Sequence, residues 1–285
     1  MCGIVAAAAG SNIVPVLVEG LKKLEYRGYD SAGLAVVART GIERVRSVGR
    51  VAELEAASVA TSAVTGIAHT RWATHGVPSE RNAHPHVSGS IAVVHNGIIE
   101  NYESLRSELT ARGYVFTSDT DTESIAHLIE ATLKGEPDLF AAVRTACRRL
   151  VGAYAIAVID HRQPGKVVVA REGSPLLLGV SDNGNYAASD ASALLQVTRN
   201  MVYLENGDIA ELTATSVRIT RLDGTPAERP IHVSQLSAAA VELGNYRHYM
   251  QKEIFEQPEA LANTLEIVGG SKSIQPGIFG AEAGQ

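Results

Sequence analysis

In the second half of the chain, turn signals separate a series of short apolar segments, and this pattern restricts the possible folds more than any other. The pairs PG, NG, NG and DG punctuate this region, and such pairs between strands indicate antiparallel hairpins. A parallel sheet needs a crossover between successive strands, usually a helix, and no strict alternation of this kind is present. We therefore expect two antiparallel sheets packed together and covered by helices, an α+β architecture. The expected strands here are 153–160, 166–170, 176–181, 185–189, 202–205, 208–212 and 216–222.

The first half of the chain mixes strands and helices. A helix is predicted over 12–26, with Ser11 or Asn12 as N-cap and Pro15 in its first turn. Thr120 and Glu123 have the spacing of a capping box at the start of another helix. A long polar loop is expected over 72–90. The other predicted elements are strands at 4–9, 31–38, 41–49, 65–70 and 91–95, and helices at 51–60, 101–112 and 138–150.

Composition and charge restrict the classes of function. The chain is 45% hydrophobic with a formal net charge of −6 and scattered charged residues, which offers no basic stripe for nucleic acid and no polybasic membrane anchor. The uncharged N-terminal stretch lacks a basic leader and is interrupted by polar residues and Pro15, so no signal peptide is expected. Cys2 and Cys147 are the only cysteines, which predicts no disulfide framework and a cytoplasmic location. Cys147 lies in an amphipathic helical pattern and is interpreted as a packed small hydrophobe.

The chain changes character near its C-terminal end. Residues 2–235 contain the predicted sheets and helices and form one expected domain. From 225 the sequence is rich in turn residues, and a new charged segment begins at Tyr246. We expect residues 236–285 to be an interdomain linker and the truncated start of a second domain.

Cys2 is the first candidate catalytic residue. If Met1 is removed, Cys2 carries both a thiol and the free α-amino group of the chain. An α-amino group has a pKa of about 7.7 to 8.0, so near neutral pH it can accept the thiol proton directly or through a water. The alternative is an inert core cysteine, as most free cysteines are.

Four further residues would suit chemistry on an amino acid amide. Asn96 and Gly97, directly after the predicted strand 91–95, offer a side-chain amide and a backbone N–H to an oxyanion; a plain hairpin turn is the alternative. Arg71 suits an α-carboxylate and Asp121 suits an α-ammonium group. A surface ion pair and a helix-start charge remain the alternatives for these two residues.

Histidines are concentrated in one region, with five of the nine between residues 69 and 95. His84 and His86 could begin a metal site. The same region holds one carboxylate, Glu80, and Pro85 separates the two histidines, so we expect no metal centre.

Taken together, the motifs resemble a known family. They are similar to the class II glutamine amidotransferases and, more narrowly, to the glutaminase half of the glutamine–fructose-6-phosphate aminotransferases. YRHYMQKEIFEQP at 246–258 resembles the beginning of the sugar-phosphate isomerase half of those enzymes. The motifs are CGIV (2–5), EYRGYDSAG (25–33), HTRWATHG (69–76), NAHPH (82–86), HNGIIENY (95–102), SDTDTE (118–123) and REGSPL (171–176).

The resemblance implies an N-terminal nucleophile (Ntn) hydrolase fold, a four-layer αββα sandwich. It implies that Cys2, exposed by removal of Met1, attacks the side-chain amide of glutamine, releases ammonia and forms a γ-glutamyl thioester that water hydrolyses. No cofactor is implied. One departure is Ala6, where the family usually has glycine.

The resemblance also implies roles for the other site residues. Asn96 and Gly97 would form the oxyanion hole. The residues that would bind glutamine are Arg71, Trp72, Thr74, His75 and Asp121. In the complete enzyme, expected to be a homodimer or larger, ammonia would reach fructose 6-phosphate in the isomerase domain that is missing here. The alternatives are another Ntn amidohydrolase or a non-catalytic module that binds an amino acid.

Overall fold

The computed structural model describes residues 2–72, 76–235, 246–248, 250–258 and 261. The chain divides into two compact units, 1–238 and 239–285. In the second unit, residues 250–258 are helical. The two sheets seen among the described residues, and the candidate site, belong to the first unit.

The larger sheet is antiparallel throughout and has β1 near its middle. β1 (Gly3–Ala9) lies between β10 (Gly184–Ala188) and β4 (Thr65–Arg71), with Ala6 opposite both Ala187 and Ile67. Its outer strands are β9 (Leu177–Ser181), β11 (Asn200–Tyr203) and β14 (Ile231–Val233) on one side, and β2 (Ser31–Ala38) and β3 (Gly41–Val48) on the other.

The smaller sheet is also antiparallel, as the turn signals predicted. Its strand order is β13-β12-β8-β7-β6-β5, and β6 and β7 make its longest pairing, from Ile91 opposite Asp160 to Ile99 opposite Gly152. The strands are β5 (His86–Ser88), β6 (Ile91–Ile99), β7 (Gly152–Asp160), β8 (Val167–Glu172), β12 (Asp208–Leu212) and β13 (Val217–Arg221).

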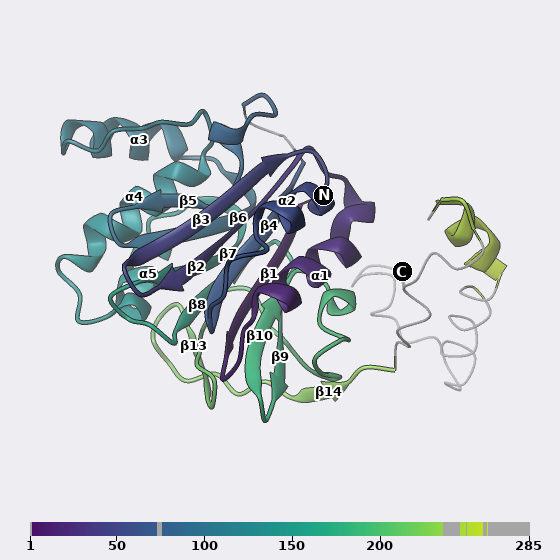
Figure 1. The fold of residues 1–285 in the computed structure, drawn as a ribbon. Helices are drawn as coiled ribbons and strands as arrows, with labels where there is room; N and C mark the ends of the chain where they lie inside the picture. Colours follow the sequence, from purple (N-terminus) through teal and green to yellow (C-terminus); the bar gives the residue numbers. More distant parts are fainter. Residues whose placement is uncertain (1, 73–75, 236–245, 249, 259–260, 262–285) are drawn as a thin grey trace, which may run out of the picture. The chain divides into compact units, whose positions relative to one another are not determined.

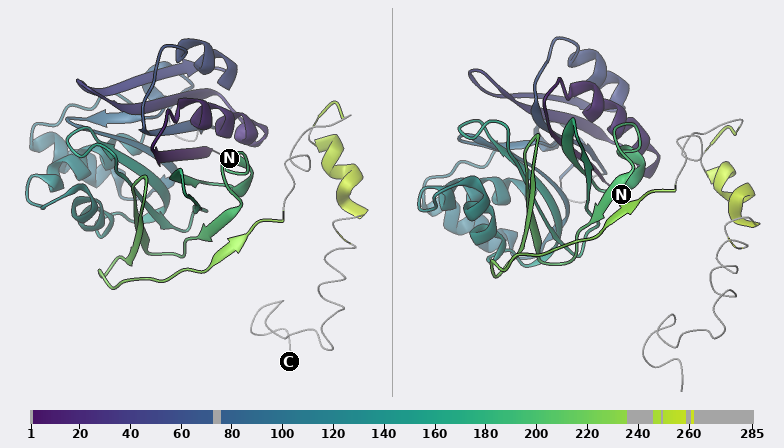
Figure 2. Two further views of the ribbon diagram at one scale, coloured as in Figure 1. Left: turned by 60° about the horizontal axis from the view of Figure 1, so that its bottom comes forward. Right: turned by 90° about the horizontal axis from the view of Figure 1, so that it is seen from below.

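Helices cover the outer faces of both sheets (Figures 1 and 2). α1 (Val14–Leu24) and α2 (Val51–Ala57) pack with the larger sheet. α3 (Tyr102–Ala111), α4 (Thr122–Leu133) and α5 (Leu139–Cys147) pack with the smaller one. Cys147 is buried in this second helical layer, as expected for a small hydrophobe. The predicted four-layer αββα arrangement is confirmed. No helix among the described residues is both long and apolar enough to cross a membrane.

The alternation of side chains along β1 explains why its sequence is apolar without interruption. Val5 and Ala7 face α1, whereas Ile4, Ala6 and Ala8 face the smaller sheet. Both faces of the strand are therefore buried. The methyl group of Ala6, the position that departs from the family pattern, lies fully buried in the core between the sheets.

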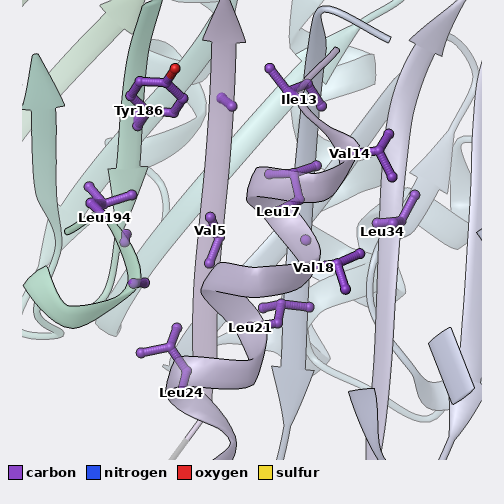
Figure 3. Packing of buried hydrophobic residues seen from close by; sticks show 14 of the residues in the cluster. Val5, Ile13, Val14, Leu17, Val18, Leu21, Leu24, Leu34, Tyr186 and Leu194 are labelled. Atoms are coloured by element: carbon purple, nitrogen blue, oxygen red, sulfur yellow. The ribbon is translucent and has the colours of Figure 1, made fainter. Parts of the chain in front are cut away.

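α1 anchors the outer layer of the larger sheet. Leu17, Leu21 and Leu24 are 0% exposed. Figure 3 shows Leu17 and Leu21 between Val5 of β1 and Leu34 of the neighbouring part of the sheet. Burying a leucine side chain stabilises a fold by about 1.5 to 3 kcal/mol. The face of α1 that carries these residues therefore holds the helix against the sheet.

Two predicted helix starts differ from the structure. α1 begins at Val14 with Ile13 as N-cap, while the Asn12 side chain accepts hydrogen bonds from the backbone N–H groups of Val14 and Ala63. It therefore joins α1 to the chain just before β4. Ser11 does not cap the helix.

The predicted capping box of Thr120 and Glu123 is wrong. α4 begins at Thr122, and Asp121 is its N-cap. The Glu123 carboxylate instead accepts hydrogen bonds from the backbone N–H groups and hydroxyls of Thr117 and Ser118. Burial opposes the charge on Glu123, but these hydrogen bonds outweigh it and lower the pKa of the carboxyl group. Glu123 therefore organises the loop before α4 rather than capping the helix.

Candidate active site

The candidate site forms where the inter-sheet core reaches one end of β1. Side chains alternate along a strand, so Cys2 projects to the same side as Ile4, toward the smaller sheet. His69 lies opposite Ile4 in the register and Arg71 is two residues further along β4, so both also face the smaller sheet. On β6, Asn96 has the same parity as Val94, which packs in the core between the sheets. The two sheets therefore bring these side chains to one place.

Cys2 is half-buried beside the backbone of Trp72. The Trp72 N–H donates a hydrogen bond to Cys2 Sγ over 3.2 Å, and the sulfur lies 3.5 Å from the Trp72 carbonyl oxygen. Burial raises the pKa of the Cys2 thiol, while the Trp72 N–H and the charge of Arg71 partly offset this effect. A thiol with a raised pKa requires a nearby base to react at neutral pH.

Asn96 and Gly97 lie inside β6 rather than after it, which corrects the sequence prediction. Asn96 Nδ2 donates a hydrogen bond to the Cys2 carbonyl oxygen over 3.2 Å. Gly97 pairs with Tyr154 but has a φ of +127°, and a Cβ atom there would lie 1.9 Å from the Ala153 carbonyl oxygen. Glycine alone tolerates both conditions. The hairpin-turn alternative for this pair is wrong.

Arg71 ends β4 and is 4% exposed. Its Nη2 donates a hydrogen bond to the Gly76 carbonyl oxygen over 3.1 Å, and its Nη1 lies 3.9 Å from Asp30 Oδ1. The surface ion pair considered from the sequence is therefore wrong. Instead, the structure places a buried guanidinium group close enough to Cys2 for its charge to lower the pKa of the thiol.

Asp121 precedes α4 and is 5% exposed. Its Oδ2 accepts a hydrogen bond from the Ile99 backbone N–H over 2.9 Å, which joins it to β6 two residues beyond Gly97. A carboxylate at a helix N-terminus is stabilised by the helix dipole. The Asp121 carboxylate therefore lies on the side of the site that is formed by the smaller sheet.

These residues surround one cavity of about 470 Å³, within the usual range for a small-molecule site. It brings together six of the eight predicted residues: Cys2, Arg71, Trp72, Asn96, Gly97 and Asp121. Thr74 and His75, the other two, lie outside the described residues.

Trp72 forms part of the cavity wall and is 54% exposed. It lies against Gly28, where a Cβ atom would come within 2.1 Å of the indole ring. Gly28 has a φ of +117°. The glycine therefore permits both the local backbone and the close approach of the indole.

Several lining residues were not predicted from the sequence. Ser174 and Pro175 come from the loop between β8 and β9 and belong to the motif REGSPL, which was the available signal. The remaining unpredicted residues are His84, His95, Ile98, Thr120 and Thr122, which come from different segments and meet only in the folded chain.

The histidine-rich region forms a buried cluster beside the cavity. The His84 ring lies 4.1 Å from that of His69 and 5.0 Å from that of His86, between centroids. Burial lowers the pKa of His69 and of His86 to about 3 and lowers that of His84 well below its usual value. All three rings are therefore neutral at neutral pH. Among the described residues, no group of three or more His, Cys, Asp or Glu side chains is arranged to hold a metal ion.

Comparisons with known proteins give the family. The sequence model of a protein family described as "Glutamine amidotransferase domain" matches residues 69–196. The chain is 60% identical over 270 residues to the glutamine–fructose-6-phosphate aminotransferase [isomerizing] of Acidithiobacillus ferridurans, which covers 93% of this chain and 44% of the relative. It is 52% identical over 285 residues to the protein of the same name from Xylella fastidiosa (strain Temecula1), covering 99% of this chain and 47% of that relative. The chain thus spans about half the length of these relatives.

A solved structure matches the fold. Glutamine phosphoribosylpyrophosphate amidotransferase from B. subtilis superposes with a TM-score of 0.67 at 24% identity, over 78% of this chain and 49% of that chain. This likeness concerns the fold alone, and it confirms the predicted Ntn hydrolase architecture. Sequence and fold agree that the chain belongs to the glutamine–fructose-6-phosphate aminotransferase family as its N-terminal glutamine amidotransferase domain.

Proposed function

We propose that the domain hydrolyses glutamine to glutamate and ammonia with Cys2 as the nucleophile. One observation carries the proposal: a single cavity holds the Cys2 thiol, the Asn96 amide, the Gly97 backbone, a buried cation at Arg71 and a buried anion at Asp121. This set supplies a nucleophile, two oxyanion donors and one partner for each charged group of an α-amino acid.

The α-amino group freed by removal of Met1 is the base in this mechanism. It takes the Cys2 thiol proton as the sulfur attacks the side-chain amide carbon of glutamine. The same proton then goes to the leaving nitrogen, and ammonia departs from a γ-glutamyl thioester. Water then attacks the thioester and gives one of its own protons, through the α-amino group, to the departing Cys2 sulfur, and glutamate is released. In a chain that retains Met1, the Cys2 nitrogen is an amide and cannot serve as this base.

Asn96 and Gly97 stabilise the negative oxygen that forms in both steps. The Asn96 Nδ2 group already lies 3.2 Å from the Cys2 carbonyl oxygen, so one of its two hydrogens remains available to the substrate oxygen. The Gly97 N–H is the second donor. Loss of one donor of this kind lowers kcat by about 10²- to 10³-fold in other enzymes.

Arg71 and Asp121 orient the substrate by its α-carboxylate and α-ammonium groups. The two side chains come from separate elements, Arg71 from β4 and Asp121 from the start of α4, and both are buried. Buried charges bind opposite charges strongly because little water screens them. The resemblance adds Trp72, Thr74 and His75 to the walls of the glutamine site.

A further part of the proposal concerns the complete enzyme to which this domain belongs. We assign residues 2–235 to the glutaminase domain and 236–285 to a linker and the start of an isomerase domain, supported by the division of the chain at 238. The relatives are named for fructose 6-phosphate aminotransfer, so the ammonia is proposed to convert that sugar phosphate to glucosamine 6-phosphate. The complete enzyme is proposed to be a cytoplasmic homodimer or larger assembly.

Replacement of the nucleophile tests the function. Cys2→Ala is expected to lower glutamate release from glutamine by at least roughly 10³-fold, because no covalent intermediate can form. Cys147→Ala is the matched control, since Cys147 is buried away from the cavity, and it should keep the wild-type rate. Intact-mass spectrometry of the wild type should show loss of Met1 and a transient γ-glutamyl adduct.

The same assay separates the alternatives. Turnover of other amides with inert glutamine would favour another Ntn amidohydrolase. Binding of glutamine without any turnover by the processed chain would favour a non-catalytic module. Full activity in a chain that retains Met1 would show that the α-amino group is not the base.

A further inference from the structure

His69 connects the two sheets directly behind the nucleophile. It lies on β4, is 0% exposed, and faces β6 across the core between the sheets. Its Nε2 atom lies 3.0 Å from the His95 carbonyl oxygen and 3.0 Å from Asn96 Oδ1. His69 has no role in the proposed reaction steps.

The hydrogen bonds determine which ring nitrogen carries the proton. A backbone carbonyl oxygen only accepts hydrogen bonds, so the contact with His95 requires a proton on His69 Nε2. That N–H is a donor, and therefore the Asn96 atom facing it must be the acceptor oxygen. Burial keeps the ring neutral, with the pKa of His69 lowered to about 3. This leaves the single N–H in place throughout the neutral range.

The proton on His69 Nε2 fixes the orientation of the Asn96 side-chain amide. With its oxygen held by His69, the Asn96 amide turns its NH₂ group toward Cys2, where it donates to the carbonyl oxygen over 3.2 Å. A flipped amide would place two donors face to face at His69 and two acceptors face to face at Cys2. Both contacts are repulsive in a buried site.

We propose that His69 is a positioning residue for glutamine hydrolysis, which holds Asn96 with its NH₂ group directed at the oxyanion. This inference rests on the proposed function. His69 does not touch the substrate and transfers no proton. Its hydrogen bond to Asn96 determines whether the NH₂ group or the oxygen atom of that amide faces the oxyanion. His84 packs on the ring and supports its orientation.

The test compares variants at His69 with variants at Asn96. His69→Leu removes the N–H at similar volume, and it should lower kcat for glutamate release by roughly tenfold or more, with KM for glutamine changed by less than about threefold. His69→Gln offers an amide N–H in the same region and should recover most of the lost kcat. In the double variant His69→Leu/Asn96→Ala, kcat should equal that of Asn96→Ala, because His69 acts only through Asn96.

A second readout separates positioning from general disruption. Alkylation of Cys2 by iodoacetamide forms no oxyanion, so its rate should stay within about twofold of wild type in His69→Leu. His127→Leu is the matched control, because His127 is also buried and its ring is also hydrogen-bonded, to Ser88 Oγ at 2.8 Å. It should lower thermal stability and keep kcat.

Three results would overturn the role of His69 in an active wild-type enzyme. They are an unchanged kcat in His69→Leu, a fall in alkylation that matches the fall in kcat, and a double variant slower than Asn96→Ala by the full effect of His69→Leu. If the processed wild type releases no glutamate, the proposed function itself fails, and this outcome is distinct from the other three.

Discussion

At the scale of single residues, the site depends on a backbone conformation that one residue type provides. Gly97 combines a φ of +127° with an approach to the Ala153 carbonyl oxygen that leaves no space for a Cβ atom. The proposed oxyanion hole uses the N–H of this same residue. A change in the backbone at Gly97 would therefore move a donor away from the reacting oxygen.

Gly97→Ala is expected to lower kcat for glutamine hydrolysis by at least roughly tenfold, because the added methyl group must displace β6 from β7. Steady-state glutamate release measures this effect. Gly113→Ala is the control, since Gly113 also has a positive φ, of +88°, but a Cβ atom there would meet no other atom within 4 Å. It should cost stability and keep kcat. Equal activity losses in the two variants would argue against a specific role for Gly97.

At the scale of elements, β1 joins the outer helical layer to the core between the sheets. Val5 packs under α1, whereas Ile4 and Ala6 pack against the smaller sheet. Cys2, the proposed nucleophile, is the residue directly before this strand. Its position is therefore held by packing on both faces of β1 rather than by a local turn.

Leu21→Ala should lower the free energy of unfolding by about 2 to 5 kcal/mol, because Leu21 is 0% exposed on the inner face of α1 and its loss leaves a cavity. Urea unfolding measures the change. Val59→Ala is the comparison, since Val59 is 82% exposed, and its effect should stay within about 0.5 kcal/mol. A similarly small effect of Leu21→Ala would mean that α1 contributes little to the stability of the larger sheet.

At the scale of the whole molecule, the fold buries histidines that an unfolded chain would protonate. Burial lowers the pKa of His69, His84, His86 and His127. These rings stay neutral in the folded protein below the pH at which free histidine, with a pKa of about 6.5, takes up a proton. The unfolded chain therefore binds more protons than the folded one in this range.

Stability should fall as pH decreases from about 6.5 toward 3, since the state that binds more protons is favoured in acid. Each buried histidine contributes up to roughly 1.4 kcal/mol of destabilisation by pH 5.5. Urea unfolding at pH 7.5 and pH 5.5 measures the effect above the range in which carboxylates titrate. The His127→Leu variant should show a smaller difference between the two pH values. A midpoint that is the same at both would contradict the neutral buried state of these histidines.

The antiparallel sheets could be predicted from the sequence, because hairpin turns and alternating apolar residues are local signals. The sequence motifs also named six residues that the structure brings to one cavity. Helix starts were less predictable: the Thr120–Glu123 spacing indicated a capping box, yet Glu123 bonds to Thr117 and Ser118. The Glu123 carboxylate could accept hydrogen bonds either from the start of the helix or from the loop before it. The sequence spacing does not distinguish these two possibilities.

The assembly of the site, in contrast, depends on contacts between segments that lie far apart in the chain. The position of Asn96 and Gly97 inside β6 depends on pairing with β7, a strand much later in the chain. The contact of His69 with Asn96 depends on the packing of two sheets. Local patterns report which face of a strand is buried, whereas a donor and its acceptor on different sheets meet only after the layers have packed.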